Sequence, residues 1–502
     1  MNITKRVISM FLCIGVFIWM FYVGLTGTMD PVEEEVVDKD SLVIWYTDES
    51  LSDYINSACV SFNEMYDVRV VPKIQSGDEY LEQINEVSIK DEGTPDLYVI
   101  SNDSLERAYL GGLATLVTED ADIFNDEFPT AAKQAVSYRG NKIAYPLYYE
   151  TSALLYNRSY LHEMAENQLL ADESAEPEDG EEIAEDVVAE DEIGLSTEEK
   201  IERRIQKAIP ETFDELLEFA NTYDAPPQVE TVFKWDVKDI FYNYFFVGNY
   251  MDIGGENGDD TGIINIYNKD AIDALSVYQN MNQFFSFDYE NITYESVIQE
   301  FIEGKLVFTT ATSDIIRRLE EAKAEGTFEY EYGITNIPDL NDEMTSKSMS
   351  VTSTVVVNGF SEKKELANAF AKYLTVTKAT DLYEMTGKLS ACKTVQNEEV
   401  KFDVFFEEYS ESSPLPKMMA TSNFWLLAET TFSNIWSGKS INSEVKKLSE
   451  QVKEQVTGVV VSEDFIDIPD TFEEIEYLDE DAEREAAQED ENASEDADEN
   501  AE

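Results

Sequence analysis

Only a few residues of this chain could carry metal-based or nucleophilic chemistry. His162 is the single histidine, and the cysteines are limited to Cys13, Cys59 and Cys392. Neither a His/Cys metal cluster nor a disulfide scaffold can be built from so few ligands. Any Ser-His-Asp or Cys-His triad would have to use His162. The residue types therefore leave catalysis by carboxylates alone, or plain binding, and they predict no metal and no cofactor.

Polar residues follow two predicted strands at the point where each strand ends. Leu42–Tyr46 is a short apolar run typical of a buried strand, and Thr47-Asp48-Glu49 follows it. Leu97–Ile100 predicts another strand, which Ser101-Asn102-Asp103 follows. Parallel sheets bind ligands at the carboxyl ends of their strands. These two segments are therefore the first candidates for a binding site.

Alternating helices and strands are predicted to position these residues. Apolar residues recur at spacings of three and four over Leu51–Met65, which predicts an amphipathic helix. A β-α-β-α-β order at the start of the body predicts a parallel sheet with helices on its faces. Further strands are predicted at 68–71, 143–149, 153–156, 305–310, 330–334 and 351–357, and further helices at 80–89, 297–302, 364–374, 424–436 and 441–456.

Composition and charge bound the class of protein. The 502 residues predict two or three folding units, and the 43% apolar content is enough for a sizeable core. Asp and Glu number 105 against 36 Lys and Arg, a formal net charge of −69. A chain this acidic repels phosphate backbones, so nucleic-acid binding through a basic face is excluded.

The acidic residues are concentrated in two long runs. Residues 166–199 contain fifteen acids without a Lys or Arg, and 471–502 contain sixteen with only Arg484. Like charges at this density do not favour ordering, so we expect a disordered acidic insertion at 166–199 and a disordered tail at 466–502. A solvated tether is favoured over an interaction arm for both runs. A shorter acidic linker is predicted at 29–40.

The N-terminus predicts the compartment. Val7–Leu25 is an uncharged run of nineteen residues, about 28 Å as a helix, which is close to the thickness of a hydrocarbon core. Lys5 and Arg6 precede it, so residues 1–28 are interpreted as a cytoplasmic start and a transmembrane anchor, with the rest outside the cell. A cleaved signal is the weaker alternative. In an oxidising space, Cys59 and Cys392 could form a disulfide or remain two free buried thiols.

Several stretches over about 41–460 occur together in a recognisable order: LVIWYTDES, GTPDLYVISND, RGNKIAYPLYYETSALLYNRSYL, FIEGKLVFT and ATSNFWLLAE. In this order they resemble the bacterial extracellular solute-binding proteins of sugar ABC importers, above all the maltose-binding group. The resemblance implies a two-lobed periplasmic-binding-protein-like α/β fold with a hinge. It places one lobe at 41–148 plus 350–395 and the other at 149–347 plus 396–460.

The resemblance also implies partners. A carbohydrate would bind between the lobes, and the permease subunits of an ABC importer would recognise the closed state. The chain is expected to be a monomer tethered by its N-terminal helix, and not an enzyme. Two alternatives remain at this point: a membrane-anchored ligand sensor, and a glycosidase that would use a carboxylate pair such as Asp48 and Glu150.

The implied ligand-binding residues are carboxylates and aromatic rings. Carboxylates accept hydrogen bonds from sugar hydroxyls, and aromatic rings stack on the C–H face. The matching positions are Asp48, Glu49, Asp103, Glu150, Trp425 and, in a looser match, Phe241; the nearby alternatives are Tyr46, Trp235 and Tyr242. Core packing is favoured for Phe241 and Tyr242. Maltose binders have tryptophans at the positions of Ile100 and of residues 311–313. Fewer stacking rings are therefore expected here, and the ligand could be a smaller sugar or another polyol-like solute.

Overall fold

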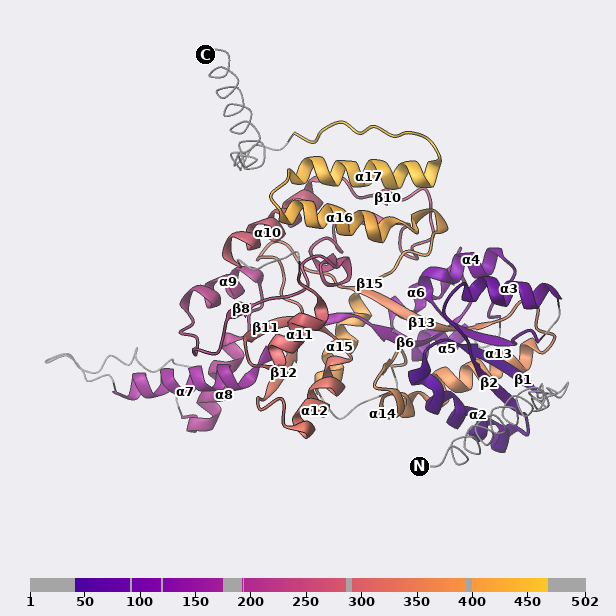
Figure 1. Ribbon diagram of the computed structural model, residues 1–502, viewed down its shortest axis with the longest axis horizontal. Coiled ribbons are helices and arrows are strands. Elements are labelled where there is room, and N and C mark those ends of the chain that lie inside the picture. The colour runs from indigo at the N-terminus through magenta and orange to yellow at the C-terminus, as the bar shows by residue number, and fades with distance from the viewer. Residues whose placement is uncertain are drawn as a thin grey trace, which may run out of the picture. The chain divides into compact units, whose positions relative to one another are not determined.

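A computed structural model describes residues 41–90, 93–118, 121–174, 192, 194–285, 291–393, 395 and 400–467. The predicted anchor, the acidic linker at 29–40 and the tail from 468 onward lie outside these residues. Within the described part of the chain, no helix is both long and apolar enough to cross a membrane. The fold considered below belongs to one compact unit that ends at Val461 (Figure 1).

A mixed sheet organises the first lobe. The path through it is β14 (Leu389–Ser390), β6 (Tyr145–Glu150), β13 (Met349–Val357), β3 (Leu97–Ser101), β1 (Leu42–Tyr46) and β2 (Val70–Ile74), and β15 (Ser413–Pro414) pairs with β13. β1 is parallel to β2 and β3, as predicted, whereas β13 is antiparallel to β3 and β6. All five residues of β1 are buried, as expected for a strand covered on both faces.

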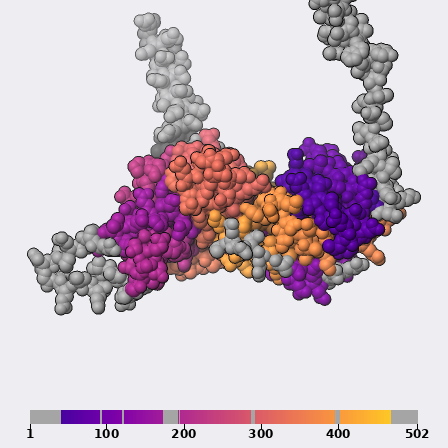
Figure 2. Space-filling view, turned by 90° about the horizontal axis from the view of Figure 1, so that it is seen from below, coloured from indigo at the N-terminus to yellow at the C-terminus, as the bar shows by residue number. Residues whose placement is uncertain are grey.

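Helices of the first lobe pack their apolar stripes on this sheet. The stripe of the first helix is Tyr54, Ile55, Ala58, Cys59 and Phe62, close to the predicted spacing. Figure 2 shows the early indigo surface beside an orange surface from much later in the chain. The helices are α2 (Ser52–Tyr66), α3 (Tyr80–Lys90), α4 (Leu105–Leu110), α5 (Ala121–Glu127), α6 (Thr130–Ala135), α13 (Lys364–Lys372) and α14 (Leu382–Thr386).

A smaller sheet organises the second lobe. Its strand order is β12 (Tyr332–Thr335), β7 (Ser152–Asn157), β11 (Leu306–Thr312) and β8 (Thr231–Phe233). Every residue of β11 is buried, because helices and neighbouring strands enclose it. The surrounding helices are α7 (Arg158–Ser174), α8 (Thr197–Ala208), α9 (Phe213–Thr222), α10 (Lys269–Phe284), α11 (Tyr294–Ile302), α12 (Ile315–Glu325), α16 (Phe424–Trp436) and α17 (Ile441–Thr457).

Two short hairpins complete the strands. β4 (Ser137–Tyr138) pairs with β5 (Asn141–Lys142), and β9 (Asp252–Ile253) pairs with β10 (Ile264–Asn265). The Gly/Asp-rich turn of the second hairpin contains Gly254 and Gly258, which both adopt positive φ.

Helix α15 (Val400–Glu411) connects the lobes. Figure 1 shows it between the elements of the two sheets, and it contacts α6 of the first lobe as well as β7 and β12 of the second. The Tyr409 ring stacks on Tyr149 at the end of β6, with centroids 3.9 Å apart and planes 3° apart. The Tyr409 hydroxyl also lies 2.9 Å from the Thr352 hydroxyl of β13. α15 is thus held against both strands that lead out of the first lobe.

Glu408 on α15 faces the same connecting region. Its Oε1 accepts a hydrogen bond from the Ile337 amide at 2.7 Å, and its Oε2 accepts one from the Ser348 hydroxyl at 2.9 Å. Burial raises the pKa of Glu408 to about 7, an effect that these hydrogen bonds oppose and the carboxylates of Asp339 and Glu407 reinforce.

We therefore expect Glu408 to make stability depend on pH. Its folded pKa of about 7 lies above the usual 4.5, so its stabilising effect is complete below pH 4.5 and is lost as pH rises through 7. The loss is on the order of 3 kcal/mol. Urea titrations of wild type and Glu408→Gln across this range measure it, because the amide cannot titrate. Equal pH slopes for the two proteins would contradict the expectation.

The prediction of disorder over 166–199 is wrong at both ends of that run. α7 continues to Ser174, and α8 begins at Thr197 with Ser196 as its N-cap and Glu199 completing a capping box. The buried carboxylate of Glu192 accepts two hydrogen bonds from the Arg204 guanidinium, at 2.9 and 2.8 Å. An arginine just beyond the acidic run thus supplies the partner that composition alone did not reveal. The middle of the run lies outside the described residues.

The two cysteines of the described chain are not joined by a disulfide. Cys59 and Cys392 are both buried. Burial raises the pKa of the Cys59 thiol to about 12, so this thiol stays protonated and inert at neutral pH. Of the two alternatives, the structure supports two buried thiols without a disulfide.

Candidate functional site

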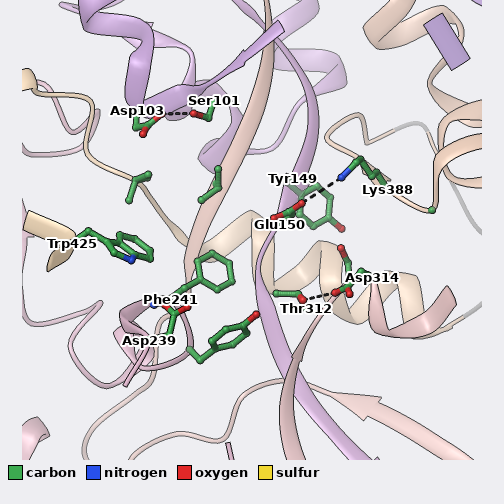
Figure 3. A pocket seen from close by; sticks show the side chains of 15 residues that line it. Ser101, Asp103, Tyr149, Glu150, Asp239, Phe241, Thr312, Asp314, Lys388 and Trp425 are labelled. Atoms are coloured by element: carbon green, nitrogen blue, oxygen red, sulfur yellow. Dashed lines mark hydrogen bonds and ion pairs between the residues drawn. The ribbon is translucent and has the colours of Figure 1, made fainter. Parts of the chain in front are cut away.

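A cavity of about 630 Å³ lies between the two lobes, within the size range of small-molecule sites (Figure 3). It is bounded by the end of β3 and the end of β6 on one side, and by the end of β11 and the start of α16 on the other. The lining residues are Ser101, Asp103, Tyr149, Glu150, Asp239, Phe241, Tyr242, Thr312, Ser313, Asp314, Val351, Gly387, Lys388, Leu415 and Trp425.

The turn after β3 presents Asp103 to the cavity. Asn102 is buried and fixes this turn, because its amide donates to the Leu415 carbonyl at 2.8 Å and its carbonyl accepts from the Thr352 amide at 2.9 Å. Asp103 itself is exposed and accepts hydrogen bonds from the hydroxyls of Ser101 and Ser104. Asp103 follows β3 and lines the cavity, at the position where the sequence predicted a ligand-facing group.

A lysine joins two of the predicted carboxylates. The Lys388 ammonium lies 3.1 Å from Asp48 Oδ2 and 3.6 Å from Glu150 Oε1, and 4.6 Å above the ring of Tyr148. Gly387 ends α14 with φ of 76°, a left-handed conformation that turns the chain toward this cluster. Glu150 and Lys388 line the cavity, whereas Asp48 reaches it only through Lys388.

Asp48 and Lys388 stabilise each other's charged forms. Burial alone would raise the pKa of Asp48, but hydrogen bonds from Ser50 and the charge of Lys388 outweigh burial and lower it. Burial would likewise lower the pKa of Lys388, but Tyr148, Glu150 and Asp48 raise it overall. The Lys388 side chain therefore keeps its proton while it contacts the carboxylates of Asp48 and Glu150.

Aromatic rings form the wall of the second lobe. Trp425 lies in the first turn of α16 and is only partly buried, with its ring centroid 6.4 Å from that of Phe241. Tyr242 stacks on Tyr294 at 4.7 Å with planes 9° apart. Asp239 caps the short helix Ile240–Tyr242 by accepting a hydrogen bond from the Phe241 amide at 2.9 Å. An apolar face and a carboxylate thus stand side by side, as sugar recognition requires.

Apart from Asp48, which pairs with Lys388 behind the cavity wall, the predicted site residues divide into three groups. Asp103, Glu150, Phe241 and Trp425 line the cavity, as does the alternative Tyr242; Phe241 and Tyr242 are nevertheless buried. Glu49 is exposed at the start of a short helix and does not line the cavity. Among the alternatives, Tyr46 and Trp235 are buried in the core, and the Trp235 indole donates to Asn243 Oδ1 at 2.8 Å.

Sequence reasoning missed three charged residues of the cavity, Asp239, Asp314 and Lys388. Asp239 carries a usable signal, because an Asp immediately before a helical turn is a common N-cap. The sequence around Lys388 gives no such signal apart from the preceding glycine, Gly387. Asp314 follows β11, at the carboxyl end of a strand, where the rule used for Asp48 and Asp103 would have found it.

Known structures show the same fold. The extracellular solute-binding protein of Staphylococcus aureus in complex with maltose superposes with a TM-score of 0.65 at 18% identity, covering 84% of this chain and 98% of that one. At this identity the likeness establishes the two-lobed α/β fold alone.

Two proteins of Bacillus subtilis (strain 168) are similar in sequence. The maltodextrin-binding protein MdxE is 24% identical over 270 residues, which are 50% of this chain and 63% of that protein. The match therefore spans less than two thirds of MdxE. The galactooligosaccharide-binding protein is 22% identical over 471 residues, 92% of this chain and 98% of that protein.

The family match covers both lobes. Residues 57–408 match the bacterial extracellular solute-binding proteins, from α2 of the first lobe through the second lobe to α15. With the fold and the cavity between the lobes, this match shows that the chain belongs to the family of bacterial extracellular solute-binding proteins.

Proposed function

We propose that the chain is the substrate-binding subunit of a carbohydrate ABC importer. The observation that carries this proposal is the cavity between the lobes, where Trp425 and Phe241 of the second lobe lie opposite Asp103 of the first, and Glu150 stands in the segment that connects the lobes. Carboxylates suited to hydroxyl groups opposite an aromatic face suited to a sugar ring are the chemistry of carbohydrate recognition. The names of the two Bacillus relatives support the same ligand class. Membership of a binding-protein family favours a transport receptor over the sensor.

Capture is proposed to proceed by closure of the lobes about the connecting strands. The lobes are proposed to be 41–148 plus 350–395 and 149–347 plus 396–460, with the chain crossing between them near 149–151, near 348–350 and near 395. A ligand that contacts both lobes stabilises the closed state by its differential affinity for that state. The permease subunits are proposed to recognise this state, with the chain acting as a monomer.

Thermal unfolding of the full chain against a panel of mono- and oligosaccharides tests the ligand class. A ligand present at 100 times its Kd stabilises the folded state by about 2.7 kcal/mol, enough to raise Tm by several degrees. At least one carbohydrate should produce this shift in wild type and a smaller one in Trp425→Ala. No shift with any carbohydrate, together with a shift by another class of solute, would contradict the proposal.

We further propose that residues 1–28 anchor the protein in the membrane. The support is the uncharged run Val7–Leu25 behind Lys5 and Arg6. Protein purified from cells should then retain its first residues and stay with the membrane fraction in high salt. Recovery of a soluble form that begins near Thr28 would show that the segment is a cleaved signal.

A further inference from the structure

The charges that line the cavity are mostly negative. Asp103, Glu150, Asp239 and Asp314 contribute four carboxylates, and Lys388 is the one cation among the described lining residues. Lys388 already pairs with Glu150 and with Asp48 behind it, and Arg318 lies 3.6 Å from Asp314. The remaining two carboxylates, Asp103 and Asp239, accept hydrogen bonds only from hydroxyl or backbone N–H donors of the described chain.

Asp239 stands on the aromatic wall. Figure 3 shows it with Phe241 and Trp425 on the side of the cavity away from Lys388. The hydrogen bond from the Phe241 amide fixes its carboxylate at the start of the short helix that carries Phe241. A carboxylate next to aromatic faces suits an organic ammonium group, because the ring faces attract a cation within about 6 Å and the carboxylate accepts its N–H bonds.

The surroundings of Asp239 add to the negative potential. Asp236 and Glu429 line an adjoining hollow with Asp239, and Lys238 is the one cation on its described rim. Burial, followed by the Asp236 carboxylate, raises the pKa of Asp239, while burial and then Asp239 raise the pKa of Glu429. Three carboxylates thus line this hollow with one described lysine, and a cationic ligand bound at Asp239 would balance part of their negative charge.

A metal ion does not fit this wall. Among the described residues, no group of three or more His, Cys, Asp or Glu side chains is arranged to hold one. The aromatic rings on either side would also give a hard cation no oxygen ligands, whereas they suit the C–H and N–H surface of an organic amine.

We propose that the wall formed by Asp239, Phe241 and Trp425 binds a protonated amine, so that the solute is an amino sugar or an oligosaccharide that contains one. The inference rests on the proposed function and narrows its ligand class. An acidic sugar would meet Asp103 and Asp239 as like charges and should bind more weakly. A neutral sugar of the same shape keeps the hydroxyl contacts and the stacking, but it loses the charge-assisted hydrogen bond.

Three trisaccharides in which both linkages are β-1,4 test the inference: those of glucosamine, glucose and glucuronic acid. Calorimetric titrations of the full chain should give a Kd for the glucosamine trimer about tenfold lower than for the glucose trimer. The glucuronic acid trimer should bind most weakly. The amine preference should shrink in about 1 M salt, where charges more than about 3 Å apart are screened.

The Asp239→Asn variant tests whether Asp239 causes the preference for the glucosamine trimer. Asparagine can still cap the helix at Ile240, so the melting temperature without ligand checks that the variant folds. Its preference for the glucosamine trimer over the glucose trimer should fall about tenfold. Glu325→Gln is the matched control, because this exposed acid lies at the end of α12 and away from the cavity, and it should keep the full preference.

The outcomes separate the inference from the proposed function. If the neutral trimer or another neutral sugar binds as tightly as the amine, or if Asp239→Asn keeps the preference, the amine site is wrong and the carbohydrate receptor stands. If the glucuronic acid trimer binds best, the cavity favours a negatively charged ligand and the amine site is wrong. If neither the trimers nor any carbohydrate of the wider panel binds, the proposed function is wrong. The inference, which rests on it, is then wrong as well.

Discussion

Replacement of Trp425 by alanine should weaken carbohydrate binding by about 30- to 1000-fold while leaving the fold largely intact. The ring is only partly buried and faces the cavity beside Phe241. Stacking on a sugar removes apolar area from water and adds roughly 0.5–1.5 kcal/mol beyond that area. The expected loss of about 2–4 kcal/mol of binding free energy corresponds to this range of affinities. Calorimetry with the best carbohydrate of the panel measures it.

Stability of the same variant provides the control. A urea titration of Trp425→Ala should show a smaller loss than the 3–5 kcal/mol typical of a core tryptophan. A large loss of stability with unchanged affinity would mean that Trp425 is a packing residue and that the second lobe binds its ligand elsewhere.

Trp235→Ala should have the opposite effect. Trp235 is fully buried, stacks on Phe233 at 4.7 Å and meets Trp436 edge-on at 5.4 Å. Truncation removes these contacts and leaves the Asn243 acceptor without its 2.8 Å hydrogen bond. We expect a loss of about 3–5 kcal/mol in the free energy of unfolding, measured by urea titration.

The two tryptophans form a matched pair. Where Trp235→Ala still folds, its affinity for the best carbohydrate should stay within about threefold of wild type, well under 1 kcal/mol. A loss of affinity as large as that of Trp425→Ala, without a loss of stability, would place Trp235 in the site and contradict its assignment to the core.

Local patterns predicted much of the first lobe. The apolar run of β1 and the spacing of α2 report burial within a few neighbouring residues, and both elements appear within one residue of their predicted limits. The insertion of β13 between β3 and β6 could not be predicted in this way. It joins segments about 200 to 250 residues apart, and nothing in the strand itself records its neighbours.

The site shows the same division. Asp103 was predicted because it follows a strand, and Glu150 and Trp425 were predicted because they match positions of the family that the sequence resembles. Lys388 was missed because its position depends on α14, which packs against α2 from more than 300 residues away. Composition misjudged the acidic run for a related reason, since the Arg204 partner of Glu192 lies outside the run.

The central claim is that one solute is held by both lobes at once. Calorimetric titration of the best carbohydrate into wild type, Asp103→Asn and Trp425→Ala tests it most directly, because Asp103 belongs to the first lobe and Trp425 to the second. The account predicts one site per chain and a weaker affinity in both variants, with the larger loss for Trp425→Ala. Full affinity in both variants, with the sugar still bound, would contradict the claim that the ligand lies between the lobes.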